Sequence, residues 1–155
     1  MSAVAIDLDG ALGGTRPLWD AWITSAADVL EVAPGSLPHD RSEAAAELDR
    51  LGAGNWRTLL QRFSEDRAPV YLRREAAVSA ALRSLEASGC TVGMFTDAPE
   101  PLARVALAQL GATRRVHALE SGSGALERLL ERLGDDAVVV HTREELMSYV
   151  VTPAP

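Results

Sequence analysis

The sequence contains no lysine, and all 15 of its basic residues are arginine. A site that depends on a lysine side chain therefore cannot be built from this chain. The 22 acidic residues outnumber the basic ones and give a net charge of -7 at pH 7. Proteins that bind nucleic acid need a basic surface to displace counterions from phosphates, and no basic stripe is present in this sequence. The charge balance therefore argues against nucleic acid as a partner.

Cysteine and long apolar runs are also scarce. Cys90 is the only cysteine, so the chain cannot form an intramolecular disulfide. The N-terminal residues lead directly into a short apolar strand, without a basic segment followed by a long apolar one. We therefore expect a soluble, cytoplasmic protein with no membrane partner. With 155 residues and 47% hydrophobic content, the chain can bury one core and at most a small second lobe.

Apolar strands alternate with amphipathic helices along most of the sequence. We predict strands at residues 2–7, 91–95, 116–119 and 137–141, and their nearly unbroken apolar runs are typical of parallel strands covered on both faces. Helices are predicted where leucine, alanine and valine recur with helical spacing, before Gly89 and Gly134, which we expect to end them. This alternation predicts an α/β fold, a Rossmann-like three-layer parallel sheet.

Residues 15–74, called the insert below, interrupt this alternation. They contain three helical patterns in succession, separated by glycine- and proline-rich turns, and no strand. We predict a small α-helical cap at 15–74, with 1–14 and 75–155 forming the core domain. Its tryptophans Trp19, Trp22 and Trp56 are expected to pack a miniature core of their own, although a dimer surface would use them equally well. At the other end, 150–155 are expected to form a short edge strand and a frayed tail.

The most informative motif is Asp7-Leu8-Asp9-Gly10, which follows the first strand. Successive side chains of an extended chain point to opposite faces, so Asp7 and Asp9 project from the same side. They lie at the carboxyl end of a strand, where open parallel sheets bind their ligands. Two carboxylates so close together can divide a catalytic role between them. A solvated turn is the alternative interpretation of an isolated Asp-x-Asp sequence.

Three features together resemble the haloacid dehalogenase superfamily, over essentially the whole chain. They are the run Asp7-Leu8-Asp9-Gly10-Ala11-Leu12, the helical insert after it, and Thr96-Asp97 at the end of the second strand. The resemblance implies a shortened helical cap of the first type. It also implies that Asp7 is a nucleophile that forms an aspartyl phosphate and that Asp9 is the general acid and base.

The resemblance also assigns the groups that would bind the phosphoryl group and a metal. Thr96 and the backbone amides of the aspartate loop, including Gly10, would hold phosphoryl oxygens. Mg²⁺ would be bound by Asp7 and by the backbone carbonyl of Asp9. Asp97 would either belong to the phosphoryl site or cap the helix that begins near Pro99.

The sequence departs from the family pattern at three places. Ala11 replaces a threonine that would brace the aspartate loop, and the third motif, near residues 119–124, has no lysine. The fourth motif should end the strand at 137–141 with acidic residues, but His141 and Thr142 stand there. Mg²⁺ would therefore be held weakly or not at all. Because single preorganised electrostatic groups are worth about 100- to 1000-fold in rate, two such losses could reduce turnover to near background.

Other residues could replace the missing groups. Arg16 or Arg143 could supply a cation. Glu144 or Glu145 could turn toward a metal, and His141 could join Asp7 and Asp9 around a softer divalent ion. The alternative interpretation is structural: a hydrogen-bonded histidine at a strand end and favourable acidic charges in the first turn of a helix.

Three functions remain open from the sequence. The first is hydrolysis of phosphomonoesters through Asp7 and Asp9, weak or unusual in its use of metal. The second is a catalytically degenerate module that binds a small phosphorylated molecule or a protein partner. The third is a carbon-halogen hydrolase, which needs no Mg²⁺ but generally lacks a second carboxylate at the position of Asp9.

Overall fold

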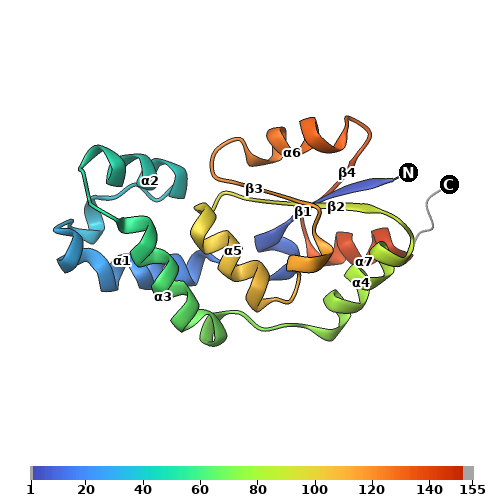
Figure 1. Cartoon of the computed structure of the whole chain (residues 1–155), viewed down its shortest axis with the longest axis horizontal. Helices are drawn as coiled ribbons and strands as arrows, with labels where there is room; N and C mark the ends of the chain where they lie inside the picture. Colours follow the sequence, from blue (N-terminus) through green and yellow to red (C-terminus); the bar gives the residue numbers. More distant parts are fainter. Residues whose placement is uncertain (1, 152–155) are drawn as a thin grey trace.

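The computed structural model describes residues 2–151 and contains one parallel sheet with the strand order β3-β2-β1-β4. The strands are β1 (Ala3–Asp7), β2 (Thr91–Thr96), β3 (Ala118–Ser121) and β4 (Val138–Val140). Helix α6 (Ala125–Leu133) covers one face of the sheet, and α4 (Ala76–Ala87), α5 (Glu100–Gln109) and α7 (Arg143–Val151) cover the other (Figure 1). The prediction of a three-layer, Rossmann-like α/β fold is confirmed.

Alternating side chains of the central strand β1 pack into the two apolar layers. Val4 and Ile6 belong to the larger core, while Ala5 and Phe95 of β2 pack with Leu129 of α6 on the other face. Gly93 on β2 allows α6 to lie close to the sheet, because a Cβ atom there would stand 2.6 Å from a Leu129 methyl group. The loop that joins β3 to α6 lies at the carboxyl ends of the strands, where it lines the same cavity as Asp7.

The insert forms three helices that gather at one end of the molecule, beyond the carboxyl ends of the strands (Figure 1). They are α1 (Arg16–Leu30), α2 (Arg41–Arg50) and α3 (Trp56–Tyr71), with a short 3₁₀ turn at Pro34–Ser36. The ring centroids of Trp22 lie 5.3 Å from Trp19 and 6.0 Å from Trp56, and all three side chains are buried. The three tryptophans pack against one another, but they belong to the same buried apolar cluster as Val4 and Ile6 of β1, so the prediction of a separate miniature core is wrong.

The sequence prediction is wrong about the end of the described chain. Val150 and Val151 lie in α7 and not in an edge strand, and 152–155 lie outside the described residues. The β-branched valines favour a strand locally, but α7 buries Leu146 and packs Met147, Tyr149 and Val150 against the core. Strand β3 also begins two residues later than expected. Within residues 2–151, no helix is both long and apolar enough to cross a membrane.

Candidate active site

Asp7 is the last residue of β1, and its carboxylate is held by the loop that follows it. The chain turns at once into a single π-helical turn, Leu8–Leu12. Asp7 Oδ1 accepts hydrogen bonds from the backbone amides of Asp9, at 3.0 Å, and Gly10, at 3.3 Å. None of the described residues donates a hydrogen bond to Asp7 Oδ2. One oxygen therefore fixes the orientation of the carboxylate, and the other is free to react.

Gly10 holds the aspartate loop against the end of β4. A Cβ atom at this position would stand only 1.9 Å from the carbonyl oxygen of His141. Glycine is required here by the close approach of two backbones. The amide of Gly10, expected to hold a phosphoryl oxygen, donates to Asp7 in this structure.

Both oxygens of Asp9 accept hydrogen bonds. Asp9 Oδ1 accepts from the amide of Thr15 at 2.8 Å and from its hydroxyl group. Asp9 Oδ2 accepts from the hydroxyl group of Thr96, which in turn accepts from the amide of Ala98 at 3.2 Å. Thr96, expected to bind a phosphoryl group, therefore contacts the second aspartate, and Thr15 joins the site without having been predicted.

A buried arginine from the insert completes this network. Arg41 is the first residue of α2, and only 3% of its surface is exposed. Its Nη1 donates to the hydroxyl oxygen of Thr15 at 2.6 Å, and its Nη2 donates to Asp97 Oδ1 at 2.5 Å and lies 3.5 Å from Asp9 Oδ1. The alternative that Asp97 caps the next helix is wrong, because Asp97 is bound by this guanidinium and α5 begins after Pro99 without a side-chain cap.

A cavity of about 590 Å³ opens beside the two aspartates, between the core and the insert. Asp7, Asp9 and Thr96 line it from the strand ends, and His141 lines it beyond β4. The insert contributes Asp40, Ser42 and Glu43 from the start of α2, and the loop before α6 contributes Gly122, Ser123 and Gly124. Five carboxylates line the cavity and no arginine does, so its wall is acidic.

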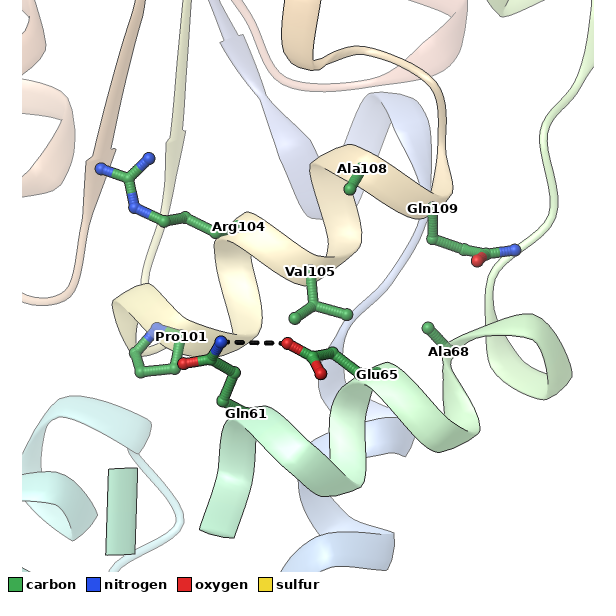
Figure 2. Close-up of a pocket in the computed structure, with 8 residues that line it drawn as sticks. All are labelled: Gln61, Glu65, Ala68, Pro101, Arg104, Val105, Ala108 and Gln109. Atoms are coloured by element: carbon green, nitrogen blue, oxygen red, sulfur yellow. Dashed lines mark hydrogen bonds between the residues drawn. The ribbon is translucent and has the colours of Figure 1, made fainter. Parts of the chain in front are cut away.

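Two further cavities continue along the boundary between insert and core. The first, of about 560 Å³, shares Ser42, Gly122 and Ser123 with the aspartate cavity. The second, of about 440 Å³, lies between α3 and α5 and shares Gln61, Pro101 and Arg104 with the first. Figure 2 shows that Gln61 and Glu65 of α3 face Pro101 and Val105 of α5 there. The aspartate cavity therefore adjoins the first of these cavities, and the first adjoins the second, through shared lining residues.

The residues expected to replace the missing family groups have structural roles. Arg16 binds the ring and the carbonyl oxygen of His39. Arg143 binds Glu75 at 2.7 Å and approaches the carbonyl oxygens of Ala11 and Leu12, at 3.4 Å each, and so braces the aspartate loop. Thus neither Arg16 nor Arg143 supplies the cation of the site.

Glu145 and His141 were considered as replacements for the missing metal ligands, and each makes a different contact in the structure. Glu145 accepts from the amide of His141 at 2.8 Å, while its own amide donates to the hydroxyl of Thr142 at 3.1 Å, which caps α7. The ring of His141 packs edge-on against Phe95, with 5.9 Å between the centroids. The acidic residues of this turn therefore stabilise the start of a helix, as the structural interpretation expected.

The donor set does not fit a Mg²⁺ site built from protein side chains. No group of three or more His, Cys, Asp and Glu side chains gathers around one point in residues 2–151. Both side-chain oxygens of Asp9 are taken by other donors, and a guanidinium lies 3.5 Å from one of them. Mg²⁺ requires near-octahedral oxygen ligation, and the predicted ligands, the Asp7 carboxylate and the backbone carbonyl of Asp9, supply only one carboxylate.

Burial raises the pKa of Asp7, the nearby charge of Asp9 raises it further, and the amide of Gly10 opposes both effects. A carboxyl group with a raised pKa binds protons more strongly in the folded state, so its stability contribution falls as pH rises through that pKa. We expect Asp7→Asn to be more stable than the unsubstituted protein at pH 7.5 and this advantage to shrink toward pH 4. Urea denaturation at both pH values measures the difference. An advantage independent of pH would contradict this cause.

Solved structures with the same fold come from the haloacid dehalogenase superfamily. A protein described as a β-phosphoglucomutase from Thermotoga maritima aligns over 97% of this chain and 99% of its own, with 16% identity and a TM-score of 0.58. A HAD phosphatase from Thermococcus onnurineus aligns over 91% and 77%, with 18% identity and a TM-score of 0.58. A HAD-superfamily hydrolase of subfamily IA from Geobacter sulfurreducens aligns over 99% and 87%, with 16% identity and a TM-score of 0.56.

These comparisons confirm the resemblance at the level of the fold. The chain has the α/β fold of haloacid dehalogenase-like hydrolases and phosphatases. No model of a protein family matches the sequence, and no curated protein is significantly similar to it.

Sequence reasoning missed two residues of the site. Thr15 lies six positions after Asp9, at the junction with the insert, and no local pattern marks it. Arg41 stands in Asp40-Arg41-Ser42-Glu43, which is an ordinary helix start, with Asp40 accepting from the amide of Glu43 at 2.9 Å. Its partners Asp9 and Asp97 are distant in sequence, so only the tertiary structure identifies its role.

Proposed function

We propose that this protein hydrolyses phosphomonoesters through a covalent phosphoryl intermediate on Asp7. One observation carries the proposal: Asp7 has one oxygen fixed by two loop amides and the other free, beside a 590 Å³ cavity. An oriented carboxylate with a free oxygen, at the carboxyl end of a central parallel strand, suits nucleophilic attack on phosphorus. The fold shared with phosphatases supports the same function.

The reaction takes two steps. Asp7 Oδ2 forms a bond to phosphorus, the bond to the ester oxygen breaks, and Asp9 gives a proton to the departing alkoxide. Asp9 then takes a proton from water, the water oxygen attacks phosphorus, and Asp7 is released with inorganic phosphate. Asp9 can exchange protons only after its present hydrogen bonds to Thr15 and Thr96 are rearranged. The arrangement in which Asp9 is bound by Thr15 and Thr96 is therefore the resting arrangement of the site.

A second candidate function is a binding module without turnover. The acidic wall of the cavity favours this function, because its five carboxylates oppose the approach of a phosphate dianion. The four donor groups around Asp9 favour it as well, because they occupy the carboxylate that would have to exchange protons during turnover. A carbon-halogen hydrolase would also use Asp7 alone as its nucleophile.

The three functions are separated by one set of assays on the purified protein. A panel of phosphomonoesters is incubated with Mg²⁺, Mn²⁺, Co²⁺ or a chelator, and 2-haloacids are tested for halide release. We expect phosphate release that falls at least about 1000-fold in Asp7→Asn, because the nucleophile is lost. Ser2→Ala, far from the cavity, serves as the purification control. Equal phosphate release from Asp7→Asn and the unsubstituted protein would overturn the proposal, and halide release would support the dehalogenase.

A further inference from the structure

A further cavity, separate from the aspartates, has the opposite charge. Its volume is about 500 Å³, and it shares no lining residue with the aspartate cavity. Three arginines line it, Arg74, Arg114 and Arg115, together with a single carboxylate, that of Glu86. In a chain with a net charge of -7, three of the 15 basic residues thus gather around one cavity.

The three arginines come from parts of the chain that only the fold brings together. Arg74 belongs to the segment between α3 and α4, whereas Arg114 and Arg115 belong to the 3₁₀ turn Thr113–Arg115, which follows α5. Like charges that line one cavity repel one another. A negatively charged molecule bound between them would relieve this repulsion.

Only one of the three positive charges is neutralised by the protein. Arg115 Nη1 donates to the carboxylate of Glu86, so these two residues form a neutral pair. Neither Arg74 nor Arg114 pairs with a carboxylate in residues 2–151. Two guanidinium charges of the cavity are therefore left to bind an anion.

Arg74 is held in place by the end of α5. Its Nε donates to the carbonyl oxygen of Gln109, the last residue of that helix, at 3.2 Å. Its guanidinium packs against Gly111, where an added Cβ atom would stand 2.7 Å from the guanidinium carbon. Gly111 has a φ of 71°, so glycine permits both the turn after α5 and this close approach. Within residues 2–151, nothing accepts a hydrogen bond from Nη1 or Nη2 of Arg74.

We propose that this cavity binds a small phosphate-bearing molecule through Arg74 and Arg114. A guanidinium group binds two phosphate oxygens at once through parallel N–H donors. Thr113 lines the same cavity and carries a hydroxyl group that can also donate. The volume of 500 Å³ falls within the range of about 300–1,000 Å³ that is typical of small-molecule sites. Binding here does not involve Asp7 and needs no hydrolysis.

Calorimetric titration of Asp7→Asn tests the site, because the proposed hydrolysis cannot consume the probe in that variant. Inorganic phosphate, pyrophosphate and glucose 6-phosphate are the three probes. We expect at least one to bind saturably at millimolar concentration or below. Adding Arg74→Gln or Arg114→Gln should weaken binding at least about tenfold, because each removes charge-assisted hydrogen bonds. Adding Glu86→Gln should strengthen binding, because the only carboxylate of the cavity is removed.

Arg73→Gln is the matched control, because Arg73 is the neighbouring residue, is exposed and does not line the cavity. Circular dichroism checks that Arg74→Gln is folded. Arg114→Gln gives an independent variant, because the side chain of Arg114 forms no hydrogen bond within residues 2–151.

The outcomes separate the sources of the ligand from failure of the proposal. Tightest binding of glucose 6-phosphate supports an organic phosphate, and binding of the inorganic probes that is as tight or tighter supports recognition of the phosphate group alone. Lack of saturation by all three probes overturns the proposal. Equal weakening by Arg73→Gln and Arg114→Gln also overturns it, because binding would then follow net charge only. Binding unchanged in both Arg74→Gln and Arg114→Gln would place the probe elsewhere on the protein and overturn it as well.

Discussion

We expect Gly10→Ala to destabilise the protein by about 3 kcal/mol or more and to abolish the proposed hydrolysis of phosphomonoesters. The added methyl group would stand 1.9 Å from the carbonyl oxygen of His141. Because the obstacle is backbone, no change of side-chain rotamer can relieve it, and either the aspartate loop or the end of β4 must move. The amide of Gly10 would then leave Asp7 Oδ1, and the orientation of the Asp7 carboxylate would be lost.

Gly14→Ala is the matched control for this substitution, because an added Cβ atom at Gly14 meets nothing within 4 Å. That variant should be unchanged in stability or gain up to about 1 kcal/mol, since alanine reduces the freedom of the unfolded chain. Urea denaturation measures both variants, and circular dichroism checks that each is folded. Equal stabilities for the two variants would show that the loop can move away from His141 at little cost.

The second large effect is expected at the centre of the insert. Trp22→Ala should cost about 3–5 kcal/mol, because it removes a fully buried ring that lies between Trp19 and Trp56. Trp22→Phe keeps most of the volume and should cost less. Hydrogen exchange of α1 and α3 amides, compared with amides of β1, locates the loss within the insert. A cost of less than 1 kcal/mol for Trp22→Ala would show that the insert does not depend on this cluster.

Local patterns predicted the core fold well. Strand β1 and the aspartate motif lie within ten consecutive residues, so the burial of the strand and the position of Asp7 at its end could be inferred without any distant contact. The expected alternation does not extend to Asp9, because the strand ends at Asp7 and Asp9 lies in the helical turn after it. Helices α4 and α6 follow helical spacing of apolar residues and end at Gly89 and Gly134, which both have positive φ angles. These features need only the immediate neighbours of each residue.

Features that depend on distant residues were not predicted. The valines near residue 150 have strand propensity, but packing of α7 on the core decides their conformation. Arg41 was missed because its partners lie more than thirty residues before it and more than fifty residues after it. The sequence did indicate that the family's cation and acidic residues were missing, but it placed the substitute cation at Arg16 or Arg143, which both bind elsewhere.

The position of the insert within the chain has a consequence for synthesis. Strand β1 is made first, yet it lies at the centre of the sheet, where Ala3 pairs with Thr91 and Val4 pairs with Val138. At about 5–20 residues per second, a ribosome needs roughly 7 to 27 seconds to produce both neighbours. During that time the apolar strand has two open edges, while the insert can already collapse around its tryptophans. The newborn chain is thus most vulnerable to aggregation at the strand that ends in Asp7.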